Sequence, residues 1–278
     1  MLSPLLITLR EGLEAALIIG MLLAFLNKAG QRSQFWSVWT GAGFAVVISF
    51  AAGAFLYFAA IEFEGRGEQV FEGVTMLLAT GILTWMIFWM RRRASDLKAH
   101  LEGKVANTLG TGSSLGLVGL AFVVVVREGI ETALFLFSAS RVSNSPALFT
   151  IGGALGLLAA IVIGWGLYKG SARLNLRLFF SFTSVLLIVF AAGLLAHGIH
   201  EFQEAGLLPV FVEHVWNLNG VIDENAGVGA FLKALIGYNG NPSLIETVVW
   251  FTYLFGGLGL YFLRGIKSTP GAVQKSMA

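Results

Sequence analysis

The sequence predicts an all-α integral membrane protein with seven transmembrane helices, organised as two inverted three-helix repeats plus a seventh helix. Of its 278 residues, 56% are hydrophobic and 12% are charged, whereas a soluble domain has about 25% charged residues. Seven apolar stretches are long enough to cross a bilayer, which takes about 20 residues. One charged motif occurs in two of these stretches. The chain has no cysteine, which excludes disulfides and thiolate metal sites.

The expected spans divide the chain into five parts. They lie near residues 4–26, 36–60, 69–90, 115–139, 147–168, 178–200 and 244–263. The first three spans form one repeat, and a basic cytoplasmic loop separates it from a second repeat of three. An acidic extracytoplasmic segment, which we expect to lie on the membrane or dip into it as a lid, precedes the seventh helix and its cytoplasmic tail. The five parts are residues 1–90, 91–114, 115–200, 201–243 and 244–278.

The distribution of basic residues gives the expected orientation, since Lys and Arg are enriched in cytoplasmic loops. Thirteen of the 18 Lys and Arg residues fall in the loops after spans one, three and five and in the C-terminal tail. The opposite loops contain only Arg66, Arg141 and Lys233. We therefore expect the N-terminus outside and the C-terminus inside. The outer loops are acidic, and their carboxylates either concentrate cations near a pore mouth or simply keep the loops solvated.

The repeated motif is Arg-Glu-Gly-x-Glu, which begins at Arg10 in the first span and at Arg127 in the fourth. The eight residues from each start share six identities at an offset of 117 positions. A charged side chain in lipid costs roughly 2.5–3.5 kcal/mol on insertion scales, so these charged groups must face one another, a cavity or a bound ion. A carboxylate cluster that occurs twice within the membrane indicates cation transport.

The two motif positions also predict that the repeats are inverted. If the spans alternate in direction, the first runs inward and the fourth runs outward, because a unit of three spans reverses the direction of the next unit. Inverted repeats with a binding site near the membrane midplane are a recurring design of transporters.

The spacing within each motif places its two carboxylates on one helix face, since residues three and four positions apart are neighbours. The expected metal ligands are Glu11, Glu14, Glu128 and Glu131, and the expected counter-ions are Arg10 and Arg127. These groups sum to a charge of −2, which a divalent ion would neutralise. Oxygen ligands suit hard cations such as Mg, Ca and Mn, and by the same logic ferric iron, with ferrous iron acceptable. The alternative is a buried Arg–Glu network that only joins helices, although buried ion pairs are weak stabilising devices.

A second polar cluster lies where the sixth span meets the outer face. Its members, spaced three and four positions apart, are His197, His200, Glu201 and Glu204. Imidazole and carboxylate groups together suit iron or zinc, so the cluster is a candidate outer loading site, which Glu72 at the start of the third span could face. The alternative is a polar helix end at the membrane surface.

The chain resembles the high-affinity iron permeases, the membrane component of oxidase-dependent iron uptake in bacteria and fungi. The resemblance rests on Arg-Glu-x-x-Glu in spans one and four, on Phe71-Glu72-Gly73, on His197 to Gly206 and on Gly237 to Leu244. It covers essentially all 278 residues. It implies iron uptake across the bacterial cytoplasmic (inner) membrane. It also implies a separate extracytoplasmic partner that oxidises or binds iron, and it leaves the iron valence open.

We therefore expect a permease rather than an enzyme, with iron ions as its substrate, membrane lipid around it and no permanently bound cofactor. Nothing in the sequence resembles a nucleic-acid surface. One alternative is a different divalent-cation carrier, with manganese as its ion, or a proton-coupled metal carrier. Another is a membrane metalloenzyme that uses the His197–Glu204 cluster, but the chain has only four histidines.

Overall fold

The computed structural model describes residues 1–93, 114–143, 145–169, 175–224 and 226–266, and these residues contain helices and no strand. The predicted all-α class is therefore confirmed. The elements are α1 (Leu2–Lys28), the short 3₁₀ turn η1 (Arg32–Gln34), α2 (Phe35–Glu62), α3 (Arg66–Arg93), α5 (Ser114–Val142), α6 (Pro146–Tyr168), α7 (Leu176–Glu204), α8 (Gly227–Ile236) and α9 (Leu244–Ile266). Residues 94–113 of the predicted basic loop and 267–278 of the predicted tail lie outside the described residues.

Each of the seven apolar stretches lies within one long helix. Five of these helices, α2, α3, α6, α7 and α9, are both long enough and apolar enough to cross a membrane. The other two, α1 and α5, are equally long, with 27 and 29 residues, but they contain the charged motifs.

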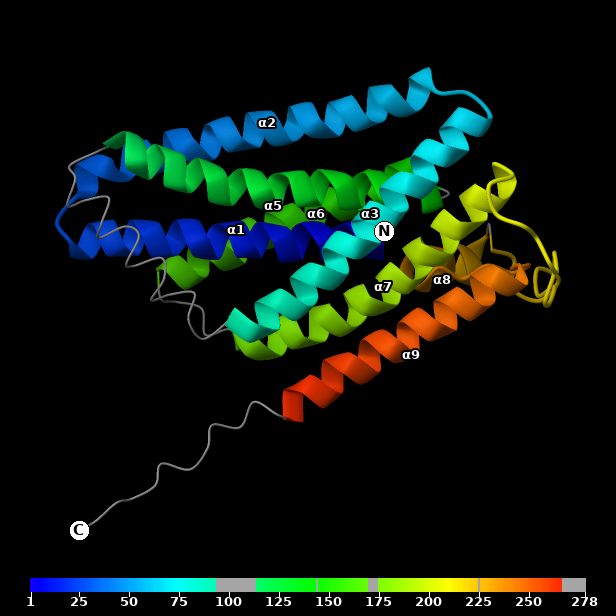
Figure 1. Ribbon diagram of the computed structural model, residues 1–278. Helices are drawn as coiled ribbons and strands as arrows, with labels where there is room; N and C mark the ends of the chain where they lie inside the picture. The colour runs from blue at the N-terminus through cyan, green and yellow to red at the C-terminus, as the bar shows by residue number, and fades with distance from the viewer. Residues whose placement is uncertain (94–113, 144, 170–174, 225, 267–278) are drawn as a thin grey trace, which may run out of the picture.

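The long helices pack in pairs whose two members are far apart in the sequence. α1 packs along α6, α2 along α5, and α3 along α7, while α9 lies against α7. Figure 1 shows α1, α2 and α5 crossing the picture in nearly the same direction, with α3, α7 and α9 running obliquely to them. A further contact between α1 and α5 brings the two motif-bearing helices together.

Two apolar clusters lie on either side of the motifs. One includes Ile7 of α1 and Phe135 of α5, together with buried residues of α3 and α7. The other includes Ile18 of α1 and Val125 of α5, together with buried residues of α2. Along both helices, the charged motif therefore lies between two apolar clusters.

Close helix approach depends on glycines at the crossing points, as is usual between membrane helices. α3 and α7 cross at Gly73 and Gly198, where a Cβ on Gly73 would lie 3.1 Å from the Gly198 carbonyl oxygen. In the α1–α6 pair, a Cβ on Gly156 would overlap the Thr8 hydroxyl and the Leu5 carbonyl oxygen. The Thr8 hydroxyl also donates to Gly153 O at 2.9 Å across this pair.

The α1–α6 contact yields a stability prediction. Gly156→Ala should destabilise the purified protein by about 1–3 kcal/mol, the usual effect of overpacking. Gly153→Ala is the matched control, since its Cβ would meet Thr8 Cγ2 at an ordinary 3.8 Å. Thermal unfolding in detergent measures both, and equal midpoints for the two variants would contradict the close approach.

Candidate metal-permeation site

The α1–α5 contact brings carboxylates from both motifs into one cluster. Glu11 of α1 and Glu128 and Glu131 of α5 each offer a carboxylate oxygen, and these three oxygens lie within 4.8 Å of one another. All three side chains are buried. The convergence expected from the sequence therefore exists for three of the four motif carboxylates.

Glu14 is also buried, but its closest charged partner is the arginine of its own motif. Arg10 Nε lies 3.3 Å from Glu14 Oε1, and Arg10 Nη1 lies 3.3 Å from Glu11 Oε1. In the second motif, Arg127 Nε lies 2.9 Å from Glu131 Oε1. Both copies therefore form the arginine–glutamate pair, four positions apart, that the spacing predicts.

Each of the four motif carboxylates keeps one buried oxygen without a hydrogen-bond partner. These atoms are Glu11 Oε2, Glu128 Oε2 and Glu131 Oε2, together with Glu14 Oε1, which nevertheless lies in the ion pair with Arg10. Leaving a buried polar atom unpaired costs roughly 1–3 kcal/mol, and more when the group is charged. A metal ion that took these oxygens as ligands would satisfy them, and a set of carboxylate oxygens fits a hard or intermediate cation.

The structure places Glu72 near the N-terminal end of α3, beside the C-terminal end of α5. Glu72 Oε1 lies 3.0 Å from Arg141 Nη1, and Glu68 Oε1 lies 3.8 Å from the same nitrogen. Glu201, half-buried on α7, interacts electrostatically with Glu72. The charges of Glu72 and Glu201 are therefore close enough to interact, and the ion pair of Glu72 with Arg141 was not anticipated.

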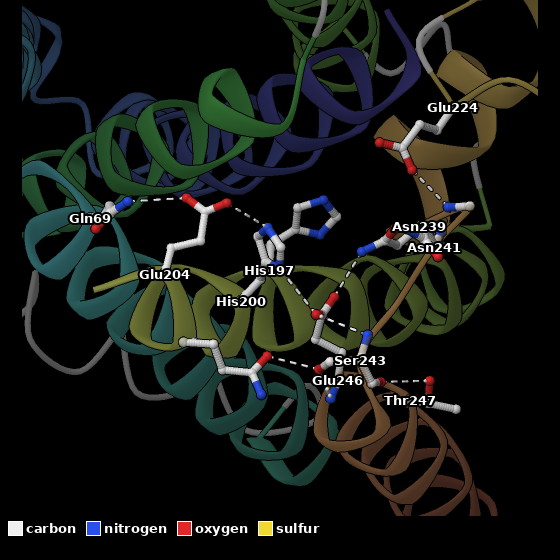
Figure 2. Close-up of polar contacts among 12 residues, drawn as sticks. Gln69, His197, His200, Glu204, Glu224, Asn239, Asn241, Ser243, Glu246 and Thr247 are labelled. Atoms are coloured by element: carbon white, nitrogen blue, oxygen red, sulfur yellow. Dashed lines mark hydrogen bonds and ion pairs between the residues drawn. The ribbon is translucent and has the colours of Figure 1, made fainter. Parts of the chain in front are cut away.

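His200 bridges two carboxylates near the C-terminal end of α7 (Figure 2). Its Nδ1 lies 3.0 Å from Glu246 Oε1, and its Nε2 lies 3.1 Å from Glu204 Oε1. Glu204 in turn accepts a hydrogen bond from Gln69 Nε2 of α3 at 3.1 Å. A metal ion that reached His200 Nε2 would have to join or displace Glu204.

His197 does not take part in this bridge. Its Nδ1 lies 3.0 Å from Gly193 O, one turn earlier in the same helix. The structure thus brings His200 and Glu204 together. The Nδ1 atom of His197 instead contacts the backbone of its own helix.

Glu246 is the functional-site candidate that the sequence reasoning missed. Its side chain is buried and accepts hydrogen bonds from Asn239 Nδ2 at 2.8 Å and from Ser243 N at 3.2 Å, in addition to the His200 contact. Ser243 Oγ accepts from Glu246 N at 3.3 Å, which completes a capping box at the start of α9. The sequence signal was Ser-x-x-Glu directly before the last apolar stretch.

Replacing Glu246 tests this capping network. Glu246→Ala removes the acceptor of the Asn239 and Ser243 donors, and hydrogen bonds to charged groups contribute about 1.5–3 kcal/mol each. We expect a clear fall in the thermal unfolding midpoint of the purified protein. Glu213→Ala serves as the control, because Glu213 is exposed in the same segment between α7 and α9. If the two variants unfold at the same temperature, the network does not stabilise the fold.

Comparisons with known proteins agree with the geometry. The profile of the Iron permease FTR1 family matches residues 1–266. The chain is 38% identical over 274 residues to a ferrous iron permease EfeU of Yersinia pestis, covering 98% of this chain and 96% of the relative. It is also 38% identical over 267 residues to a ferrous iron permease EfeU of Escherichia coli O6:K15:H31, covering 95% and 96%. No solved structure matches. The chain belongs to the iron permease FTR1 family.

Proposed function

We propose that this iron permease conducts iron through the carboxylates at the α1–α5 contact. The observation that carries the proposal is the set of four buried carboxylate oxygens, one from each motif glutamate, that have no hydrogen-bond partner. Three of these glutamates offer oxygens close enough to bind one ion. The fourth, Glu14, is held beside Arg10 and can replace a ligand as the ion moves.

All seven long helices cross the membrane in this proposal, α1 and α5 included. Their charges face each other at the α1–α5 contact, so the cost of exposing them to lipid does not arise. The basic ends of α1 and α3 and the start of α5 lie in the left half of Figure 1, which supports placing the cytoplasm there and the N-terminus outside.

The proposed inverted repeat relates α1, α2 and α3 to α5, α6 and α7. In this repeat α1 corresponds to α5, α2 to α6 and α3 to α7. The helix pairing supports it, because the α1–α6 pair then corresponds to the α5–α2 pair, and the α3–α7 pair corresponds to itself.

Individual glycine contacts also recur when α1 residues are shifted by 117 positions and α2 residues by 111. The contact of Met1 with Gly152 corresponds to that of Val118 with Gly41. In the same way, Gly12–Ala160 corresponds to Gly129–Ser49, and Ala16–Gly164 corresponds to Ala133–Gly53. The shift of 117 is the offset of the two motifs, so packing and motif follow one duplication.

Ferrous iron is the proposed ion, because the relatives are named ferrous iron permeases and a charge of −2 matches a divalent cation. The bacterial inner membrane is the proposed location. A separate extracytoplasmic protein that oxidises or binds iron is the proposed partner. Manganese is the competing substrate, since oxygen ligands accept both metals.

Uptake of radioactive iron into proteoliposomes tests the function, with ferrous and ferric iron supplied separately. Glu131→Gln should abolish ferrous uptake, because the amide keeps the shape of the side chain but loses the charge that binds the ion. Glu213→Gln, in the exposed outer segment, should leave uptake unchanged. Normal uptake by Glu131→Gln would remove Glu131 from the ligand set, and preference for manganese in competition would redirect the substrate assignment.

The outer cluster is proposed as a loading site, with His200, Glu204, Glu201 and Glu72 between the outer loops and the central carboxylates. His200→Ala should raise the KM for iron several-fold while leaving the maximal rate nearly intact, since a weaker loading site is offset by more iron. Glu128→Ala should instead abolish uptake at any concentration. Saturation curves for the two variants distinguish these roles. If His200→Ala eliminates uptake at saturating iron, the cluster belongs to the central path.

A further inference from the structure

The arginines of the two motifs have the same sequence context but different surroundings. Arg10 is completely buried, whereas the Arg127 side chain is 34% exposed. Both nevertheless lie against the last turns of α3. Met86 and Met90 contact Arg10, and Trp85 and Trp89 contact Arg127.

Arg10 is enclosed on every side. Beyond its two glutamate partners, its Nη1 lies 3.7 Å from Met86 Sδ and its Nη2 lies 3.5 Å from Met90 Sδ. Thioether sulfurs are weak hydrogen-bond acceptors, so these contacts fill the space around the guanidinium without offering it another charge partner. Arg10 therefore has no alternative position to occupy.

Arg127 lies between a carboxylate and an aromatic surface. Its Nε is 2.9 Å from Glu131 Oε1, and its Cζ is 4.9 Å from the Trp89 ring centroid and 5.4 Å from that of Trp85. The two indole rings stack with centroids 5.9 Å apart. A guanidinium group over a tryptophan face is stabilised by about 0.5–2 kcal/mol.

An iron ion bound by Glu11, Glu128 and Glu131 would repel a guanidinium that remained on Glu131. One arginine must therefore move when the ion arrives, and only Arg127 has both open space and a second partner. Arg127 precedes Glu128 along α5, and α5 begins on the side where α3 ends. A shift of Arg127 would thus open the cluster toward the basic, proposed cytoplasmic, side.

We propose that Arg127 is the inner gate of the permease, and that the stacked Trp85–Trp89 pair, which its guanidinium already contacts, holds that guanidinium when it leaves Glu131 as iron binds. Arg10, in contrast, is a fixed counter-ion. This inference rests on the proposed permeation site, and it assigns unequal roles to two residues that the duplicated motif makes equivalent in sequence. Trp85 and Trp89 act through Arg127 and are positioning residues.

The variants have distinct kinetic signatures. Arg127→Gln removes the competing cation, so iron should bind more tightly and leave more slowly, and KM and maximal rate should both fall. Trp89→Leu removes part of the aromatic surface that would hold Arg127 once it leaves Glu131, so the guanidinium should remain on Glu131. Its KM should rise about 5- to 10-fold, as expected for a cation–π contact of intermediate strength, while the maximal rate changes little.

A double-mutant cycle in proteoliposomes tests the proposal against a merely structural role for Trp89. Adding Trp89→Leu to Arg127→Gln should change KM by less than about 2-fold, because the interaction that Trp89 supports is already gone. An equal rise of KM in both backgrounds would overturn the gate. Anaerobic calorimetry with ferrous iron provides a second readout, in which the dissociation constant should follow the same pattern.

The matched control is Trp165→Leu, which removes another cation–π pair, formed by Lys169 at 4.0 Å. It should leave KM unchanged. If Trp89→Leu protein does not fold, Trp89→Phe retains an aromatic face and should give a smaller rise that again disappears with Arg127→Gln. Wild-type vesicles are measured in parallel, so absent wild-type uptake would refute the permease function, whereas additive effects with normal wild-type uptake would refute only the gate.

Discussion

The contact between α1 and α5 determines the rest of this structure, because it allows five charged side chains to be buried in an apolar molecule, with Arg127 partly exposed beside them. None of these groups could face lipid at acceptable cost, so the two helices must be central and the others must cover them. Glycines at the crossing points permit the approach, and apolar clusters on both sides of the motifs exclude water from the flanks. The same burial leaves carboxylate oxygens without hydrogen-bond partners, so the packing itself provides the acceptors on which the proposed iron site rests.

The sequence predicts the helices well because each is a long apolar stretch, and it predicts the arginine–glutamate pairs because they lie four positions apart on one helix. Contacts between different helices were harder to predict from the sequence. The cationic partner of Glu72 is Arg141, and one of the two carboxylates that contact His200 is Glu246, 46 positions away. Periodicity reveals which face of a helix is polar, but not which helix that face meets. Glu246 carried a local signal in its capping box, yet that pattern indicates a helix start and gives no hint of a histidine partner.

Duplication and divergence act at different levels in this fold. The proposed repeat preserves backbone approaches, since glycine contacts recur at constant offsets, while the side chains around the motifs differ. The difference arises because a single helix, α3, contacts both arginines and offers thioethers to one and indole rings to the other. The proposed symmetry is thus retained in the helix framework and lost around the two arginines.

The cap of α9 has a consequence for how this protein can change over evolutionary time. Ser243 and Glu246 tie the start of α9 to α7 through Gln203 and His200, and Leu218 N donates to Gly240 O at 2.8 Å. The residues between 218 and 240 therefore form an excursion whose two ends are fixed next to each other. Lengthening such a loop adds little entropy cost, about 0.6 kcal/mol per doubling. Insertions here can change the surface that this segment forms, while the contacts between α7 and α9 beside it are kept.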